Sequence, residues 1–219
     1  MKEVNSYGWK AVIGSSIGYA MDGFDLLILG FMLTLISGDL GLTTGQAGSL
    51  VTWTLVGAVI GGFIFGTLSD KFGRVRVLTW TIVLFAVFTG LCAFAQGYWD
   101  LLIYRTIAGI GLGGEFGIGM ALAAEAWSAQ HRAKATSYVA IGWQLGVLAA
   151  ALLTPVLLPY IGWRGMFMVG IIPAFVAWFF RAKLHEPEIF VQSKEIKEHS
   201  HTNSFKLLVK DVRTTKTSI

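Results

Sequence analysis

The chain has 219 residues, of which 54% are hydrophobic and 14% are charged, and its mean hydropathy is +0.64. Soluble domains carry about 25% charged residues, so the composition excludes an ordinary water-soluble domain. The formal net charge is +4, but Lys and Arg stand at the ends of apolar runs rather than in one stripe, which argues against a nucleic-acid partner. The single cysteine, Cys92, excludes an internal disulfide and a Cys metal cluster.

Six apolar stretches are each long enough to cross about 30 Å of hydrocarbon as a helix that rises about 1.5 Å per residue. Only short connectors separate most of them, which favours consecutive antiparallel helices. The predicted fold class is therefore an all-α membrane protein, a six-transmembrane-helix bundle over residues 1–183 that precedes a polar cytoplasmic segment, 184–219. The expected spans are 11–37, 46–69, 75–95, 99–121, 136–160 and 164–180.

The orientation follows from the distribution of Lys and Arg over alternate connectors, since cytoplasmic loops carry the excess of positive charge. One side of the predicted bundle has Arg164 alone. The other side has Lys2, Lys10, Lys71, Arg74, Arg76, Arg132, Lys134, Arg181 and Lys183. We therefore expect both termini in the cytoplasm and the protein in the plasma (inner) membrane.

Four charged residues fall inside the predicted spans, namely Asp22, Asp25, Arg105 and Glu115. An unpaired charge at membrane depth costs several kcal/mol, about 3 on insertion scales, so each is a candidate functional residue. With the helical rise, Asp25 lies about 21 Å from the cytoplasmic end of its span and Arg105 about 6 Å from the opposite surface. The two side chains are then level within a few Å.

This match in depth leads to the hypothesis that Asp25 and Arg105 form a switchable ion pair. An acid that loses and regains its cationic neighbour can bind and release a proton, and the freed Arg105 could hold an anion. A permanent salt bridge that only fixes helix order is the alternative. For Glu115, a packing role is as good an interpretation as a transport role, and Asp22 and the mid-span amide of Gln144 are candidates to face the same pathway.

The end of the second predicted span has a patterned run of charges and glycines. Asp70 stands at a helix C-terminus, where an anion is unfavourable, so Arg74 and Arg76 are expected to compensate it. Gly66 would allow close approach of a neighbouring helix, and Gly73 a tight turn.

Small residues also recur at four-residue spacing within the predicted spans, a pattern that predicts close helix packing. The clearest examples are Gly57 and Gly61, then Gly109, Gly113 and Gly117, and then Gly142 and Gly146.

These motifs resemble the major facilitator superfamily of transporters. Gly66, Leu68, Asp70, Gly73 and Arg74 match its signature G-x-L-x-D-r-x-G-R after the second helix. The run 105–111 is similar to its R-x-x-x-G-x-G motif, and Trp163-Arg164 precedes the sixth helix. Asp22-Gly23-Phe24-Asp25 and Glu125-Ala126-Trp127 look like the sialate:proton symporter group, and the aromatic-acid:proton symporters share the D-G-F-D element.

The resemblance implies the N-terminal half of a twelve-helix fold that imports a small organic anion, a carboxylate, together with protons. It implies that the lipid bilayer and either a missing C-terminal half or a second copy are partners. The candidate proton and substrate pathway comprises Asp22, Asp25, Arg105, Glu115 and Gln144. The implied gating motif comprises Gly66, Asp70, Gly73, Arg74 and Arg76, and the cytoplasmic charge cluster comprises Glu125, Arg132 and Glu186.

Two features depart from the related groups. The loop 128–131 lacks the proline usual in the sialate group, and 185–188 replaces the sugar-porter element P-E-S-P-R. A sugar-type proton symporter, a non-transporting membrane bundle and a half-size subunit that must oligomerise therefore stay open as alternatives.

The sequence does not favour an enzyme. The four histidines lack partners for a metal site, and 109–114 lacks the Lys-Ser or Lys-Thr of a phosphate-binding loop. We expect no cofactor and no metal. The histidines are His131, His185, His199 and His201.

Overall fold

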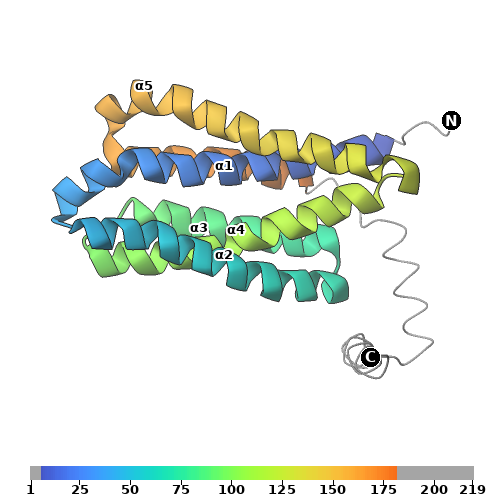
Figure 1. The fold of residues 1–219 in the computed structure, drawn as a ribbon, viewed down its shortest axis with the longest axis horizontal. Helices are drawn as coiled ribbons and strands as arrows, with labels where there is room; N and C mark the ends of the chain where they lie inside the picture. Colours follow the sequence, from blue (N-terminus) through green and yellow to red (C-terminus); the bar gives the residue numbers. More distant parts are fainter. Residues whose placement is uncertain (1–5, 182–219) are drawn as a thin grey trace, which may run out of the picture. The chain divides into compact units, whose positions relative to one another are not determined.

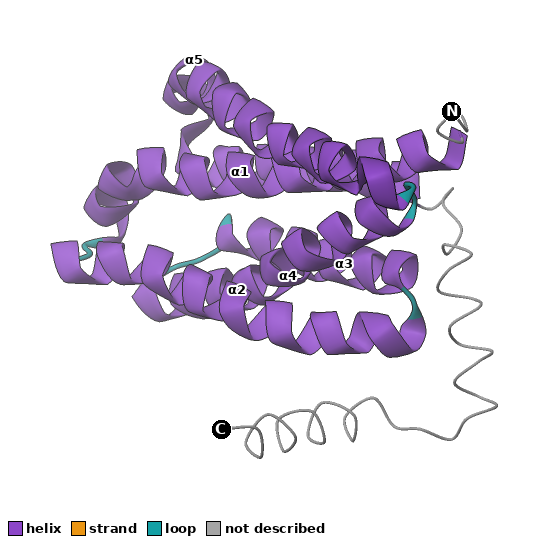
Figure 2. Ribbon diagram, turned by 45° about the vertical axis from the view of Figure 1, so that its right-hand side comes forward, coloured by secondary structure: helices purple, strands orange, loops and turns teal. Residues whose placement is uncertain are grey.

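The computed structural model describes residues 6–181, and throughout this part of the chain the elements are helices joined by short turns (Figure 2). Predictions for residues 184–219, including Glu186, lie outside the described residues. The elements are α1 (Ser6–Leu40), α2 (Thr44–Phe72), α3 (Arg74–Cys92), α4 (Tyr98–Glu125), the 3-10 helix η1 (Ala129–His131) and α5 (Arg132–Arg181).

The long element α5 contains two helical stretches, because Gly162 has a non-helical backbone with φ 65° and ψ −179°. A left-handed φ of this kind suits glycine, which has no Cβ. Figure 1 shows the ribbon of α5 turning back on itself between its gold and orange parts. The two stretches correspond to the expected spans 136–160 and 164–180.

Within residues 6–181, length and composition single out 5 helices that could cross a membrane, with Ala129–Val176 counted as one. The all-helical membrane architecture is therefore present, whereas six spans and the side on which the termini lie stay predictions.

The local sequence explains where α2 begins and where it ends before α3. Thr43 and Gln46 form a capping box at the start of α2, in which Gln46 Oε1 accepts from the Thr43 backbone N–H at 2.9 Å and Thr43 Oγ1 accepts from the Gln46 N–H at 3.3 Å. Gly73 separates α2 from α3 with φ 107°, which confirms the predicted tight turn. The turn brings the charged residues that flank it to one end of the bundle.

The predicted small-residue packing is present between α2 and α4. A Cβ at Gly61 would overlap the backbone carbonyl of Ile110, and a Cβ at Gly113 would overlap that of Ala58. The backbones are thus too close for any side chain at these positions. Gly117 has open space instead, so the contact does not extend to that turn of α4.

Close backbone packing at glycines also joins α1 and the first stretch of α5, which lie side by side in Figures 1 and 2. Added Cβ atoms at Gly142 and Gly146 would overlap the carbonyls of Ser16 and Ala20. Close backbone contact therefore fixes α1 against α5 on one side of the bundle and α2 against α4 on the other.

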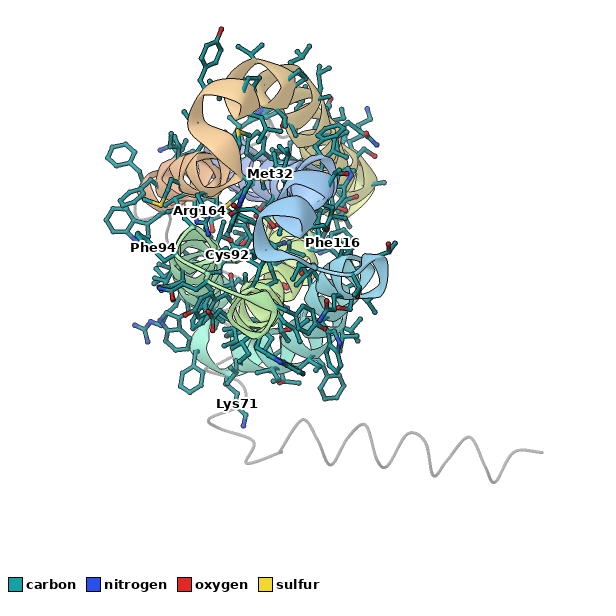
Figure 3. All side chains as sticks on the ribbon, turned by 90° about the vertical axis from the view of Figure 1, so that its left-hand side faces the viewer. Met32, Lys71, Cys92, Phe94, Phe116 and Arg164 are labelled. Carbon is teal, nitrogen blue, oxygen red and sulfur yellow. The ribbon has the colours of Figure 1, made fainter. Side chains whose placement is uncertain are left out.

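The distribution of apolar side chains is that of a bundle in lipid. Some large apolar residues are buried between helices, for example Ile28, Met32 and Phe167. Others point outward and are highly exposed, for example Phe63 at 77%. Figure 3 shows this contrast in Met32 and Cys92 inside the bundle and Phe94 at its edge. Such an outer surface is typical of a protein in lipid, because soluble monomers rarely expose large contiguous apolar patches.

We predict that Gly113→Ala and Gly117→Ala have opposite effects on thermal stability. The first creates an overlap that costs about 1–3 kcal/mol, whereas the second gains about 0.5–1 kcal/mol because alanine favours the helix. Each kcal/mol shifts the melting temperature by about 2–4 °C in a chain of this size. Thermal unfolding in detergent, followed by tryptophan fluorescence, measures both; equal shifts would contradict the close contact between α2 and α4.

Candidate functional site

The centre of the bundle contains a buried ion pair between α1 and α4. Arg105 donates from Nη1 to Asp25 Oδ1 at 3.0 Å and from Nη2 to Asp25 Oδ2 at 2.7 Å. The exposed fractions of the two side chains are 0% and 1%. The pairing expected from equal depth is therefore present, with the two-pronged geometry that suits arginine and carboxylate.

Arg105 also contacts the other helices of the bundle. Its Nε donates to Thr54 Oγ1 on α2 at 3.4 Å, and its guanidinium carbon lies 5.9 Å from the centre of the Phe167 ring, on the second stretch of α5. The thiol of Cys92, on α3, interacts with the guanidinium as well. One side chain thus has neighbours on α1, α2, α3 and α5.

These three neighbours of Arg105 were not predicted from the sequence. Thr54 is about 12 Å along its predicted span, close to the depth of Arg105, so depth could have suggested it. For Phe167 and Cys92, hydropathy does not tell which face of an apolar helix is buried.

The other predicted pathway residues are only partly brought together. Asp22 is fully buried on α1, one turn before Asp25. Glu115 is 2% exposed, and its Oε2 lies 3.3 Å from Thr81 Oγ1 of α3. The Thr81 hydroxyl also lies 2.8 Å from the Leu78 carbonyl, and its single proton can be donated to only one of these acceptors at a time.

Gln144 lies on the exposed surface of α5 rather than in the interior. Beside it in the sequence, Trp143 contacts Tyr19 of α1 at a ring separation of 5.1 Å, and Tyr19 contacts Phe116 of α4 at 5.0 Å. These aromatic rings form a half-open surface on the α1, α4 and α5 side of the bundle, one helical turn from Asp22.

The motif at the α2–α3 turn is organised around Arg74. Its guanidinium lies 3.2 Å from Asp70 Oδ1 and donates to Ser69 Oγ at 2.9 Å. Arg74 also contacts Glu125 at the end of α4, where Nη2 donates to Oε1 at 2.9 Å. The predicted compensation of Asp70 by Arg74 is confirmed.

The other residues predicted for this end are arranged less closely. Glu125, expected in a cluster with Arg132 and Glu186, has Arg74 as its ion-pair partner. Arg132 is exposed at the start of α5, and Arg76 is exposed on α3. Gly66 has no atom of the described residues within 4 Å of an added Cβ, so the neighbouring helix expected there is not among them.

The opposite end of the bundle has a second cluster, built on Trp163-Arg164. Arg164 Nη1 and Trp163 Nε1 both donate to Asp39 Oδ2 of α1, the latter at 3.0 Å. Arg164 Nη2 donates to the Ala95 carbonyl at 3.1 Å, and its guanidinium stacks 4.1 Å from the Trp163 ring centre. The cluster ties the second stretch of α5 to the ends of α1 and α3.

Long apolar helices with charges buried between them define a multi-pass membrane protein. The sequence profile of the Major Facilitator Superfamily matches residues 15–216, and the chain belongs to this family.

Two curated relatives extend the match. The chain is 75% identical over 222 residues to a "Putative metabolite transport protein" of Haemophilus influenzae, an alignment that covers 99% of this chain and 54% of the relative. It is 32% identical over 193 residues to the "Sialic acid transporter NanX" of Escherichia coli, covering 88% of this chain and 48% of the relative. The chain thus spans about half the length of these relatives, whose names are those of transporters rather than enzymes.

A solved structure shows the same fold. The xylose transporter XylE of E. coli, in a partially occluded inward-open conformation, superposes with a TM-score of 0.78 at 24% identity, covering 89% of this chain and 52% of that chain.

We predict that removing one partner of the buried pair destabilises the chain more than removing both. Asp25→Ala leaves an uncompensated guanidinium and lowers the free energy of unfolding by about 3–5 kcal/mol, whereas Asp25→Leu combined with Arg105→Met recovers most of that loss. Thermal unfolding of the single and double variants measures the difference.

The half-exposed pair of Arg164 and Asp39 is the matched control. Solvent screens such pairs, so Asp39→Ala has a clearly smaller effect than Asp25→Ala. Equal losses from the two aspartates would contradict the special role of the buried pair.

Proposed function

We propose that this chain forms the N-terminal half of a secondary active transporter that moves a small organic anion together with protons across the plasma (inner) membrane. The observation that carries the proposal is the buried, two-pronged pair of Asp25 and Arg105. Family membership and the transporter names of the relatives support it. The relatives' length supports a second, six-helix partner half, supplied by a longer chain or by a second copy.

In this proposal the bundle has six spans, with α5 crossing the membrane twice. The non-helical Gly162 and the reversal of the ribbon in Figure 1 support the division into two spans. Both termini then lie on one side, which the excess of Lys and Arg assigns to the cytoplasm. The Arg74 cluster is at the cytoplasmic end and the Arg164 cluster at the opposite end.

The pair supplies a mechanism for proton coupling. The positive charge of the arginine stabilises the buried carboxylate, but it does not stabilise the protonated, neutral acid. When Asp25 takes up a proton, Arg105 loses its counter-charge and has to find another anion. A substrate carboxylate is such an anion, so proton binding and substrate binding favour each other.

The half-open aromatic surface of Tyr19, Phe116 and Trp143, with the exposed amide of Gln144, is the proposed substrate-facing surface. Aromatic rings supply apolar contact area and the amide supplies hydrogen bonds, a combination typical of small-molecule sites. A relative is named for sialic acid, which supports a carboxylate as the substrate class. Asp22, one turn from Asp25, and Glu115 with Thr81 extend the buried acids along the same helices toward the cytoplasmic end.

The Arg74 cluster is proposed as the conformational gate. Arg74 joins the α2–α3 turn to the end of α4 through Glu125, while Asp70 stays 57% exposed. Gly66 and Asp70 thus present a surface that a partner half could contact. Breaking and forming such contacts would favour one of two arrangements of the halves.

We predict that Asp25→Asn abolishes proton coupling. The variant is tested after joining this chain to the C-terminal half of the 75% identical relative, in vesicles with an imposed proton gradient. Uptake of labelled sialic acid, aromatic acids and short monocarboxylates is compared with that of xylose. Gradient-driven uptake falls by at least about tenfold, the effect of a barrier higher by about 1.4 kcal/mol.

Asp39→Asn, at the half-exposed pair, serves as the matched control and retains the response to the gradient. Undiminished coupling in Asp25→Asn would overturn the proposed mechanism. Uptake of xylose alone would favour a sugar-type symporter. No uptake of any compound by the correctly folded joined protein would favour a non-transporting bundle.

The proposed topology predicts which surface residues can be labelled from outside intact cells. Gln96 and Gln130 are both exposed and lie in connectors on opposite sides of the proposed membrane. In a Cys92→Ser background, a membrane-impermeant maleimide labels Gln96→Cys and leaves Gln130→Cys unlabelled until the cells are lysed. The reverse pattern would place the termini outside.

A further inference from the structure

An apolar groove runs along the outside of the bundle between α3 and the second stretch of α5. Its volume is about 440 Å³ and no polar atom contributes to its accessible lining. Several lining side chains are well exposed, Val87 at 52% and Phe175 at 66%, so the groove opens to the surroundings. Its lining includes Ile82, Ala86, Val87, Phe94, Met168 and Phe175.

The length of the groove corresponds to one leaflet of a bilayer. From Ile82 to Cys92, α3 rises about 15 Å, which is half of the hydrocarbon thickness of about 30 Å. A transmembrane helix of a partner crosses both leaflets, whereas the groove corresponds to one. A single acyl chain fits both the length and the wholly apolar lining.

A polar site stands at one end of this groove. A second hollow of about 480 Å³ shares Phe94 and Met168 with the groove and adds Gln96 and Arg164 to its lining. The Arg164 side chain is 46% exposed. Of its five N–H donors, contacts with Asp39 and Ala95 use one at each Nη.

The same end carries exposed aromatic residues, Trp99 at 68% and Tyr160 at 86%. Trp and Tyr gather where hydrocarbon meets head groups, so Arg164 is at head-group depth.

We propose that the groove is a binding site for one glycerophospholipid, whose acyl chain lies between α3 and α5 and whose phosphate is held by Arg164. A guanidinium offers paired donors that match phosphate oxygens. The bound chain would fill the space between the two helices. Lipid binding in the groove requires only the membrane setting of the bundle and does not depend on transport activity.

The test is photolabelling of the full chain in vesicles of phosphatidylethanolamine and phosphatidylglycerol. A trace of phosphatidylglycerol that carries a diazirine midway along one acyl chain is the probe, and mass spectrometry maps the labelled peptides. Labelling of 82–94 and 168–178 is expected to exceed that of the α2 surface around Val59 and Phe63, although that surface is more exposed. Ala86→Trp fills the groove and abolishes this excess, whereas Val59→Trp, outside the groove, leaves it unchanged.

Arg164→Gln separates the head-group contact from the acyl-chain contact and keeps the test open if Ala86→Trp fails to fold. Native mass spectrometry of the detergent-solubilised chain measures how many molecules retain a bound phospholipid. This occupancy is expected to fall about tenfold in Arg164→Gln, as for loss of a charge-assisted contact. Even labelling of all exposed helix surfaces, or unchanged lipid retention in Arg164→Gln, would overturn the proposal. Cross-links from the groove to a second polypeptide would assign it to a protein partner instead.

Discussion

A fully buried guanidinium needs an opposite charge beside it, and much of this bundle is arranged around that requirement. Arg105 cannot reach water at 0% exposure, so its partner Asp25 must stand at the same depth on a neighbouring helix. Thr54, Cys92 and Phe167 then complete its surroundings from α2, α3 and α5. Displacing α1 or α4 along its axis would separate the two charges in a medium with little screening.

The glycine contacts make this arrangement geometrically feasible. Gly109, one turn after Arg105, lies so close to the Thr54 carbonyl that a Cβ would overlap it. The short distance between α2 and α4 lets a threonine hydroxyl, on a short side chain, reach Arg105 Nε. Close backbone packing and buried polar contacts therefore depend on each other, as expected where lipid offers neither water nor a hydrophobic driving force for association.

Much of this could be predicted from the sequence because hydrocarbon imposes simple rules. Helix length and the depths of Asp25 and Arg105 follow from a fixed rise per residue and the cost of buried charge. The tight turn at Gly73 follows from the conformational freedom of glycine. Depth does not give rotation about the helix axis, so Gln144, although mid-span, could not be assigned to the surface. Glu125 had Arg132 nearer in sequence, and only the tertiary structure shows that Arg74 is its partner.

The position of Cys92 has a chemical consequence. It is the chain's only cysteine, it is buried, and it interacts electrostatically with the guanidinium of Arg105. While the pair is formed, alkylating reagents cannot reach the sulfur. A rearrangement that moves Arg105 away would open a route to it, so the rate of thiol alkylation in the unaltered protein reports on the state of the pair.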